Sequence, residues 1–202
     1  MSLRRFLTFA LVPMFAGLVM GAGCIFDPGD EPDPEPVPEQ ILPRTSEGNL
    51  IRNLQVIYND KARTAIDRQA LYEQQIDTGS DPNTAFIFKF QPADIAAGLP
   101  PSWGSSEELT AHRAIFEAQE SGEIYSLELR IIFQEPAIPL DPPEDLRPNW
   151  TEIFASNVYL RLMFNAQDGL EVNGGQAEFK FAPAVNGLFV INEWEDRPRP
   201  VL

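Results

Sequence analysis

Cysteine and histidine are nearly absent from this chain, whose 202 residues include one of each. The single cysteine, Cys24, has no partner for a disulfide within the chain. A zinc site needs several cysteine, histidine or clustered acidic ligands, and Cys24 and His112 alone do not supply such a set. We therefore expect no metal and no cofactor.

Basic residues are also scarce, with 15 Lys and Arg against 30 Asp and Glu and a net charge of −15. No stripe of Lys and Arg offsets this charge locally, so the surface repels nucleic-acid phosphates. We exclude nucleic acid as a partner. Phosphate-cradling loops, Gly-x-Ser-x-Gly and dinucleotide fingerprints are absent from the sequence as well.

The composition is otherwise that of a globular protein. Hydrophobic residues make up 44% and charged residues 22% of the chain, and the length is that of one domain with appendages.

The N-terminus has the pattern of an export signal. Arg4 and Arg5 precede an apolar run, Phe6–Met20, that is interrupted by one threonine and followed by Gly21-Ala22-Gly23. Together with Cys24 this resembles the lipobox of bacterial lipoproteins, although Gly21 stands where an aliphatic residue is usual. The resemblance implies a signal peptide over residues 1–23, cleavage before Cys24 and acylation (palmitate) of that cysteine.

This pattern places the chain outside the cytoplasm. We expect an exported protein whose partner is a membrane, bound through N-terminal acyl chains on the bacterial cell envelope. The outer membrane or cell surface is favoured over the inner membrane. An uncleaved membrane anchor is the alternative, and with Arg4 and Arg5 inside it also leaves the rest of the chain outside.

An acidic, proline-rich tether is expected over residues 24–43. The segment DPGDEPDPEPVPEQ contains six acids, five prolines and no base. It has no apolar face to offset the entropy of ordering, and its like charges repel one another. Alternating prolines also argue against calcium binding.

Residues 44–202 read as a single α+β domain. A helix begins near Thr45-Ser46-Glu47, a second covers about residues 61–75, and a third begins at a capping box of Ser105 with Glu108. Strands are expected at 85–90, 125–133, 154–164, 177–181 and 188–195. Turn or bulge signals lie at Asp168-Gly169, Asn173-Gly174-Gly175 and Asn186-Gly187.

Consecutive strands joined by short connections predict an antiparallel sheet, with the three helices covering one face. This element order over residues 45–196, with the helix-to-strand run from Tyr58 to Phe90 and the end strand Phe189–Trp194, resembles the NTF2-like (SnoaL-like) superfamily. It is similar to small uncharacterised lipoproteins of that superfamily. The resemblance implies an NTF2-like cone, in which a curved antiparallel sheet and three helices enclose a pocket.

No catalytic residue can be assigned from the sequence. Asp60, Asp67 and Asp94 match no catalytic motif of the superfamily. His112 could be a general base with Asp94 or Glu108 nearby, but beside Arg113 on a helix face it is interpreted as a structural histidine. Candidate pocket residues, on the basis of side-chain type and the implied cone, are Tyr58, Tyr72, Trp103, His112 and Tyr159.

We therefore expect a membrane-anchored envelope lipoprotein whose domain binds a small apolar ligand or an envelope protein, without catalysis. The alternative is a small-molecule isomerase, hydratase or cyclase of the SnoaL or ketosteroid-isomerase type. A closed pocket that contains an Asp and a Tyr within reach of each other would favour the enzyme, whereas a pocket filled by Phe side chains would favour the binding module.

Overall fold

The computed structural model describes residues 39–79, 84–140 and 149–198, which belong to one compact unit beginning at Pro36. The expected signal peptide, Cys24 and most of the expected tether lie outside the described residues. No helix in the described part has both the length and the apolar character needed to span a bilayer. The helices are α1 (Glu47–Asn59), α2 (Ala65–Glu73), α3 (Pro92–Ala96) and α4 (Ser105–Glu120). The strands are β1 (Ile87–Lys89), β2 (Ser102–Gly104), β3 (Ser126–Phe133), β4 (Ile138–Pro139), β5 (Thr151–Met163), β6 (Gly169–Pro183) and β7 (Phe189–Arg197).

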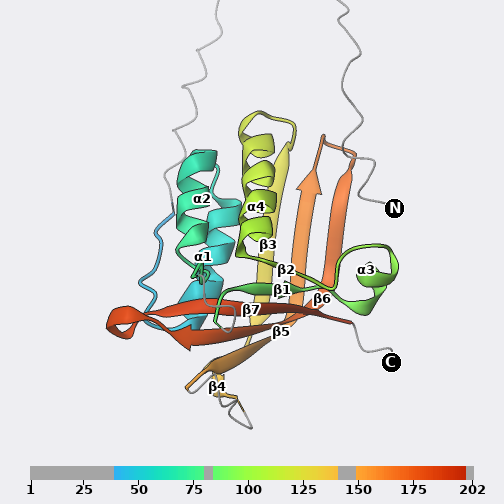
Figure 1. Cartoon of the computed structure of the whole chain (residues 1–202). Coiled ribbons are helices and arrows are strands. Elements are labelled where there is room, and N and C mark those ends of the chain that lie inside the picture. Colours follow the sequence, from blue (N-terminus) through green and yellow to red (C-terminus); the bar gives the residue numbers. More distant parts are fainter. Residues whose placement is uncertain (1–38, 80–83, 141–148, 199–202) are drawn as a thin grey trace, which may run out of the picture. The chain divides into compact units, whose positions relative to one another are not determined.

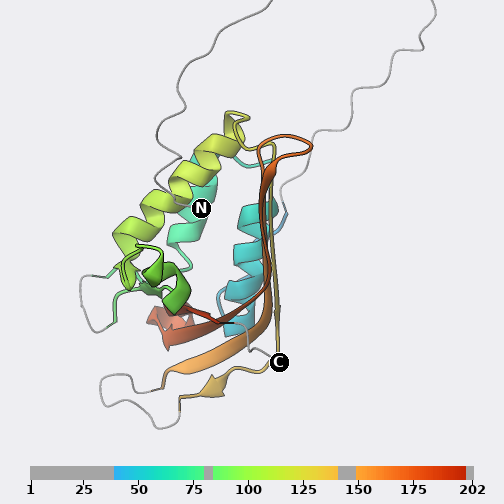
Figure 2. The same ribbon diagram turned by 90° about the vertical axis from the view of Figure 1, so that its right-hand side faces the viewer.

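All seven strands belong to one sheet in the order β2-β1-β7-β6-β5-β3, with β4 paired to β5. The sheet is open and strongly curved, so that β7, β1 and β2 turn across the lower end of the long strands β3, β5 and β6 (Figures 1 and 2). Adjacent strands are antiparallel except β1 and β7, where Ile87 pairs in parallel with Glu193. The expectation of a wholly antiparallel sheet was wrong at this pair, because β1 and β7 are distant in sequence and no hairpin fixes their direction.

The helices lie on the concave side of the sheet, α1 close to it and α4 farther out (Figure 2). They enclose one main core, which contains side chains with 0% exposure from α1, α2, α4 and β5 to β7. All members of this core come from residues 41–194, so the domain carries the core that independent folding requires. The predicted α+β cone, with a curved sheet packed against helices, is confirmed, and the short helix α3 is an addition to the three that were expected.

The first helix, α1, has the N-cap and the buried face that the sequence predicted. Ser46 is its N-cap and accepts a hydrogen bond from the Asn49 amide at 3.3 Å. Leu50, Ile51 and Leu54 on its inner face are 0% exposed, as the spacing predicted.

The second helix differs from its prediction. It starts at Ala65, and its inner face carries Arg68, which is 2% exposed, while Ile66 is 73% exposed. Arg68 is buried because its guanidinium donates to the carbonyls of Ile57 and Tyr58 in the last turn of α1, both at 2.7 Å. These carbonyls have no partner within their own helix, so a buried arginine completes the end of α1.

The capping box expected for the third long helix is displaced by one residue. Gly104 is the N-cap of α4, and its amide donates to the carboxylate of Glu107 at 3.2 Å. The expectation of a Ser105–Glu108 box was wrong, because Glu108 faces the interior instead of the helix end.

Irregular pairing bends the long strands. The register between β5 and β6 shifts near residues 155–160, and Gly174, at the bulge predicted for Asn173-Gly174-Gly175, has a φ of 77°. Ile153 and Ala155 are buried and Phe154 is 49% exposed. The expected alternation therefore fails at Phe154, since a bulge reverses which side chains point inward.

The connection from β6 to β7 passes through Asn186 and Gly187, whose φ values of 62° and 71° confirm the predicted hairpin turn.

Residues before Arg44, the expected start of the domain, already contact its helices. The Leu42 amide donates to Asn53 Oδ1 at 2.8 Å, and Asn53 Nδ2 donates back to the Leu42 carbonyl at 2.9 Å. The Glu39 amide donates to Asp60 at 3.2 Å, and Ile41 packs against the core. Residues 39–43, assigned to the tether from sequence, thus contact the helices of the domain.

Candidate functional site

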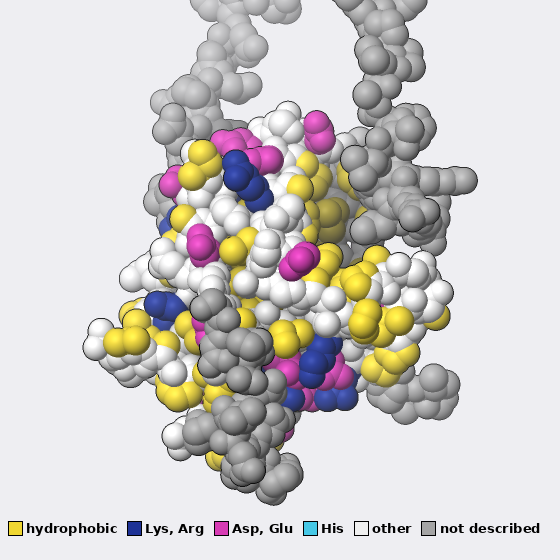
Figure 3. Space-filling view, viewed as in Figure 1, with side chains coloured by type: hydrophobic (Ala, Val, Ile, Leu, Met, Phe, Trp, Pro, Cys, Tyr) yellow, Lys and Arg dark blue, Asp and Glu magenta, His cyan; other side chains and the backbone are white. Residues whose placement is uncertain are grey.

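A pocket of about 410 Å³ lies between α4 and the concave face of the sheet. In Figure 3 it is the hollow beside α4 whose floor carries hydrophobic side chains. Its apolar lining includes Ile115 from α4, Leu129 from β3, Val158 and Leu160 from β5, and Val172 from β6.

Two sequence features build the walls of this pocket. On α4, lining residues recur at the spacing of one helical face: Glu108, Ala111, His112 and Ile115. On β6, the bulged segment 173–176 contributes four consecutive lining residues. The bulge that bends the sheet therefore also shapes the pocket.

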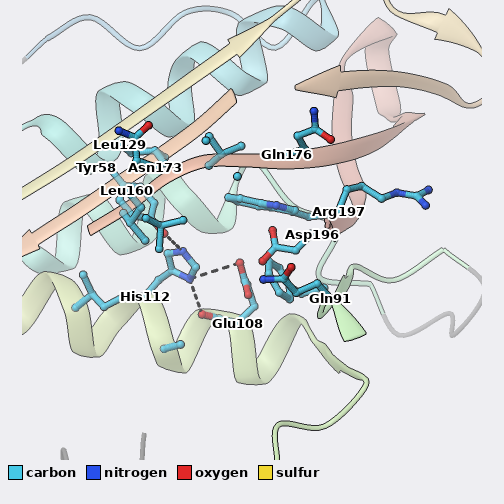
Figure 4. Close-up of a pocket in the computed structure, with 18 of the residues that line it drawn as sticks. Tyr58, Gln91, Glu108, His112, Leu129, Leu160, Asn173, Gln176, Asp196 and Arg197 are labelled. Carbon is cyan, nitrogen blue, oxygen red and sulfur yellow. Dashed lines mark hydrogen bonds and ion pairs between the residues drawn. The ribbon is translucent and has the colours of Figure 1, made fainter. Parts of the chain in front are cut away.

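His112 is held on both sides of its ring (Figure 4). Its Nδ1 lies 2.8 Å from the backbone carbonyl of Glu108, which can only accept, so Nδ1 carries the proton. Nε2 then accepts a hydrogen bond from the Tyr58 hydroxyl. Burial lowers the pKa of His112, so the ring is neutral at pH 7, and it stacks on Tyr72 with ring centroids 3.9 Å apart.

Glu108 is the buried acid of this site, with an exposed fraction of 1%. The Tyr72 hydroxyl donates to its Oε1 at 2.5 Å, and the Trp103 indole nitrogen donates to its Oε2 at 2.7 Å. Burial first, and the nearby Glu108 carboxylate next, raise the pKa values of Tyr58 and Tyr72. Both tyrosines therefore remain protonated donors.

Asp196, near the end of β7, is the second acid that lines the pocket. Its carboxyl and that of Glu108 face the same space from opposite walls (Figure 4). Burial raises the pKa of Asp196 to about 6; the neighbouring Trp194 side chain opposes this shift, and the carboxylates of Asp94 and Glu108 add to it.

The structure brings together three of the five candidate residues. Tyr58, Trp103 and His112 line the pocket, and Tyr72 lies directly behind His112. Tyr159 is not among the lining residues: it lies between Val158 and Leu160 on β5, and the Arg130 guanidinium is 5.0 Å from its ring centroid.

The lining acid Asp196 was missed from the sequence, and Glu108 was considered only as a helix cap and as a possible neighbour of His112. Glu108 was assigned to a helix cap, although its spacing of four from His112 places both on one face of α4. Asp196 shares one face of its strand with Trp194, two residues earlier. These two spacings were the available signals.

Two of the aspartates considered from the sequence have local roles. Asp60 pairs with Arg63 at the end of α1, and Asp67 interacts with its N-cap residue Thr64.

Three further carboxylates lie within 4.8 Å of one another in the described part of the chain, those of Glu178, Glu193 and Glu195. Basic side chains neutralise them. Lys89 and Lys180 each lie 2.8 Å from Glu193, and Arg197 lies 2.6 Å from Glu178 and 3.2 Å from Glu195. We interpret this cluster as a network of ion pairs across the sheet.

No protein-family model matches the chain, and no curated protein matches it. Among solved structures, a conserved protein from Planctomyces limnophilus DSM 3776 is 12% identical, with 73% of this chain and 89% of that chain covered and a TM-score of 0.49. An NTF2-like superfamily protein from Salmonella enterica serovar Typhimurium is 8% identical, with 75% and 87% covered and a TM-score of 0.47. ActVI-ORFA from Streptomyces coelicolor is 8% identical, with 74% and 89% covered and a TM-score of 0.41. These likenesses concern the fold and do not say what this chain binds.

Proposed function

We propose that this domain binds a small, mostly apolar molecule in the pocket between α4 and the sheet, and that it does so without catalysis. The observation that carries the proposal is an open space of about 410 Å³ with an apolar wall and a few polar side chains. Ligand sites typically have such a size and such a lining.

The hydrogen-bonding state of the buried polar groups argues against catalysis. Both ring nitrogens of His112 are engaged, so neither is available as a base. The protons of Tyr58, Tyr72 and Trp103 are all directed to partners within the protein. A donor engaged in this way does not stabilise an oxyanion on a substrate, which requires donors aimed at the reacting oxygen.

A proton-transfer enzyme of the isomerase type is the second candidate, and Asp196 is the observation that favours it. A carboxyl in a pocket with a pKa of about 6 can both take up and release a proton near neutral pH. In that case Asp196→Asn would abolish turnover and leave binding intact.

We also propose that the domain works outside the cytoplasm, anchored to the cell envelope by acyl chains on Cys24. The signal pattern before this cysteine supports the anchor. The alternative to a small-molecule ligand is that the surface of the domain binds another protein of the cell envelope.

A pair of substitutions on α4 tests the pocket with N-phenyl-1-naphthylamine, a neutral apolar fluorescent probe. Ala111 lines the pocket and Ala114 is exposed on the other side of the same helix. In the soluble domain from residue 36 on, Ala111→Phe fills the pocket and should abolish saturable binding, whereas Ala114→Phe should retain it. Equal binding by both variants, or no binding to the parent, would contradict the proposal.

A further inference from the structure

We infer that the ligand of this pocket is an amphipathic cation, a protonated amine on an apolar body, whose ammonium group lies between Glu108 and Asp196. The inference rests on the proposed binding function and adds the chemical class of the ligand. It follows from the charge of the pocket, from its aromatic side chains and from the engagement of its donors.

The two acids that line the pocket have no cationic partner. In the described ranges, no Lys or Arg forms an ion pair with Glu108 or Asp196. His112 lies 3.6 Å from Glu108 through Nδ1, but burial lowers its pKa and keeps it neutral. A charge removed from water without a counter-charge is costly, so a cationic ligand would gain from both carboxyls.

Among the described lining residues, Arg197 is the one Lys or Arg, and it does not supply this counter-charge. Its guanidinium pairs with Glu178 at 2.6 Å and with Glu195 at 3.2 Å. Figure 4 shows it directed away from Glu108 and Asp196. Two acids on the strands thus neutralise Arg197, and the space between the pocket acids keeps its negative charge.

Aromatic side chains surround the same part of the pocket. Phe88, Trp103 and Trp194 all line it, and Phe88 contacts both indoles, with ring centroids 5.7 and 5.6 Å apart. An ammonium group within about 6 Å of an aromatic face is attracted by the ring electrons. The apolar body of the ligand would then lie along Ile115, Leu129 and Leu160.

Anionic ligands fit less well because the pocket carries two acids and most of its strong donors are engaged. The protons of Tyr58, Tyr72 and Trp103 all go to protein acceptors. A ligand carboxylate would therefore meet two acids. Among the described lining residues, the uncharged side chains left to donate to it are the amides of Gln91, Asn173 and Gln176 and the indole of Trp194, which lies beside the Asp196 carboxyl. Like charges in a half-buried site repel, which selects against such a ligand.

The raised pKa of Asp196 in the ligand-free domain is consistent with a cationic ligand. Burial and the neighbouring carboxylates raise its pKa to about 6, which means that the ionised form is disfavoured while no cation is bound. The charged groups that face it are Glu108 from α4 and Asp94 from α3, whereas the adjoining Arg197 points away from it (Figure 4). A bound ammonium should reverse this shift, so binding should weaken as the pH falls below about 6.

Three ligands with the same eight-carbon body test the inference: octylamine, 1-octanol and octanoate. Isothermal titration calorimetry of the soluble domain at pH 7.5 compares them, since at this pH an alkylamine is protonated and a carboxylic acid is ionised. We expect octylamine to bind about tenfold or more tightly than 1-octanol, and octanoate to bind more weakly than both.

Two variants that each remove one negative charge locate the effect. Asp196→Asn should reduce octylamine affinity about tenfold and leave 1-octanol affinity unchanged. Glu123→Gln, at an exposed position after α4, should change neither, because general attraction to an acidic protein falls off with distance and salt.

The outcomes separate this inference from the proposed function. Equal affinity for octylamine and 1-octanol, or tighter octanoate binding, would overturn the cationic ligand and leave an apolar binding pocket. A loss of octylamine affinity in Glu123→Gln as large as the loss in Asp196→Asn would also overturn the cationic ligand. If none of the three ligands binds and Ala111→Phe has no effect on the naphthylamine probe, both proposals fail.

Discussion

The hydroxyl of Tyr58, from α1, donates a hydrogen bond to Nε2 of His112, from α4. Because Nδ1 of the same ring donates to the backbone of Glu108, this bond fixes one tautomer of the neutral imidazole. The pair thereby connects the helix nearest the sheet to the helix that forms the outer wall of the pocket.

We predict that Tyr58→Phe raises the pKa of His112, because a donor to Nε2 stabilises the neutral ring and its loss removes that preference. The domain should also lose about 1–2 kcal/mol of unfolding free energy, the usual effect of removing one partner of a buried hydrogen bond. His112 is the only histidine, so a proton NMR titration follows it without overlap.

The control for this substitution is Tyr125→Phe, since Tyr125 is 66% exposed. It should leave both the titration of His112 and the stability unchanged. A His112 pKa that does not move in Tyr58→Phe would mean that the hydrogen bond from Tyr58 does not contribute to it.

Two adjacent acids on α4 should differ sharply in their effect on stability. Glu108→Ala leaves the donors of Tyr72 and Trp103 without an acceptor and should cost about 3–5 kcal/mol. Glu107→Ala removes one helix-end contact and should cost about 0.5–2 kcal/mol. Urea unfolding of both variants measures the difference, and equal costs would show that Glu108 is not the centre of the buried network.

The fold was predictable to the extent that side-chain patterns are local. The spacing of Leu50, Ile51 and Leu54 predicted the inner face of α1, and Asn186-Gly187 predicted the last hairpin. The burial of Arg68 was not predictable in this way, because its partners are carbonyls of another helix. The parallel pairing of β1 with β7 likewise depends on strands about 100 residues apart.

The site was only partly predictable for a similar reason. Tyr58, Trp103 and His112 could be named by type, but the sequence does not give the directions of their hydrogen bonds. Glu108 fitted a helix cap as well as an inner face, and only the position of Gly104 as N-cap decides between them. Asp196 lies in a run of charges, where the strand register determines that it faces the pocket.

The proposed lipid anchor has its own prediction. Cys24→Ala should abolish incorporation of a palmitate analogue in growing cells and leave the protein unprocessed or released, because the Cys24 thiol is the proposed acyl acceptor. Gly21→Leu should label at least as well as the parent, since an aliphatic residue is usual at that position of a lipobox. Label retained in Cys24→Ala would contradict the lipoprotein assignment.

The last prediction concerns the stability cost of Asp196. Its pKa is about 6 in the folded domain against 3.8 for an unperturbed carboxyl. The folded state therefore binds this proton more tightly, and the stability contributed by the protonated form is lost as the pH rises through about 6. The side chain of Asp196→Asn cannot ionise, so at pH 7.5 the free energy of unfolding of this variant should exceed that of the parent by about 1–2 kcal/mol. This figure is already reduced for the partial exposure of the carboxyl. Urea unfolding from pH 7.5 to 4.5 should show this advantage shrinking, whereas Glu123→Gln should show none. A variant less stable than the parent at pH 7.5 would mean that the carboxylate already has a favourable partner in the free protein, and would remove one support for a cationic ligand.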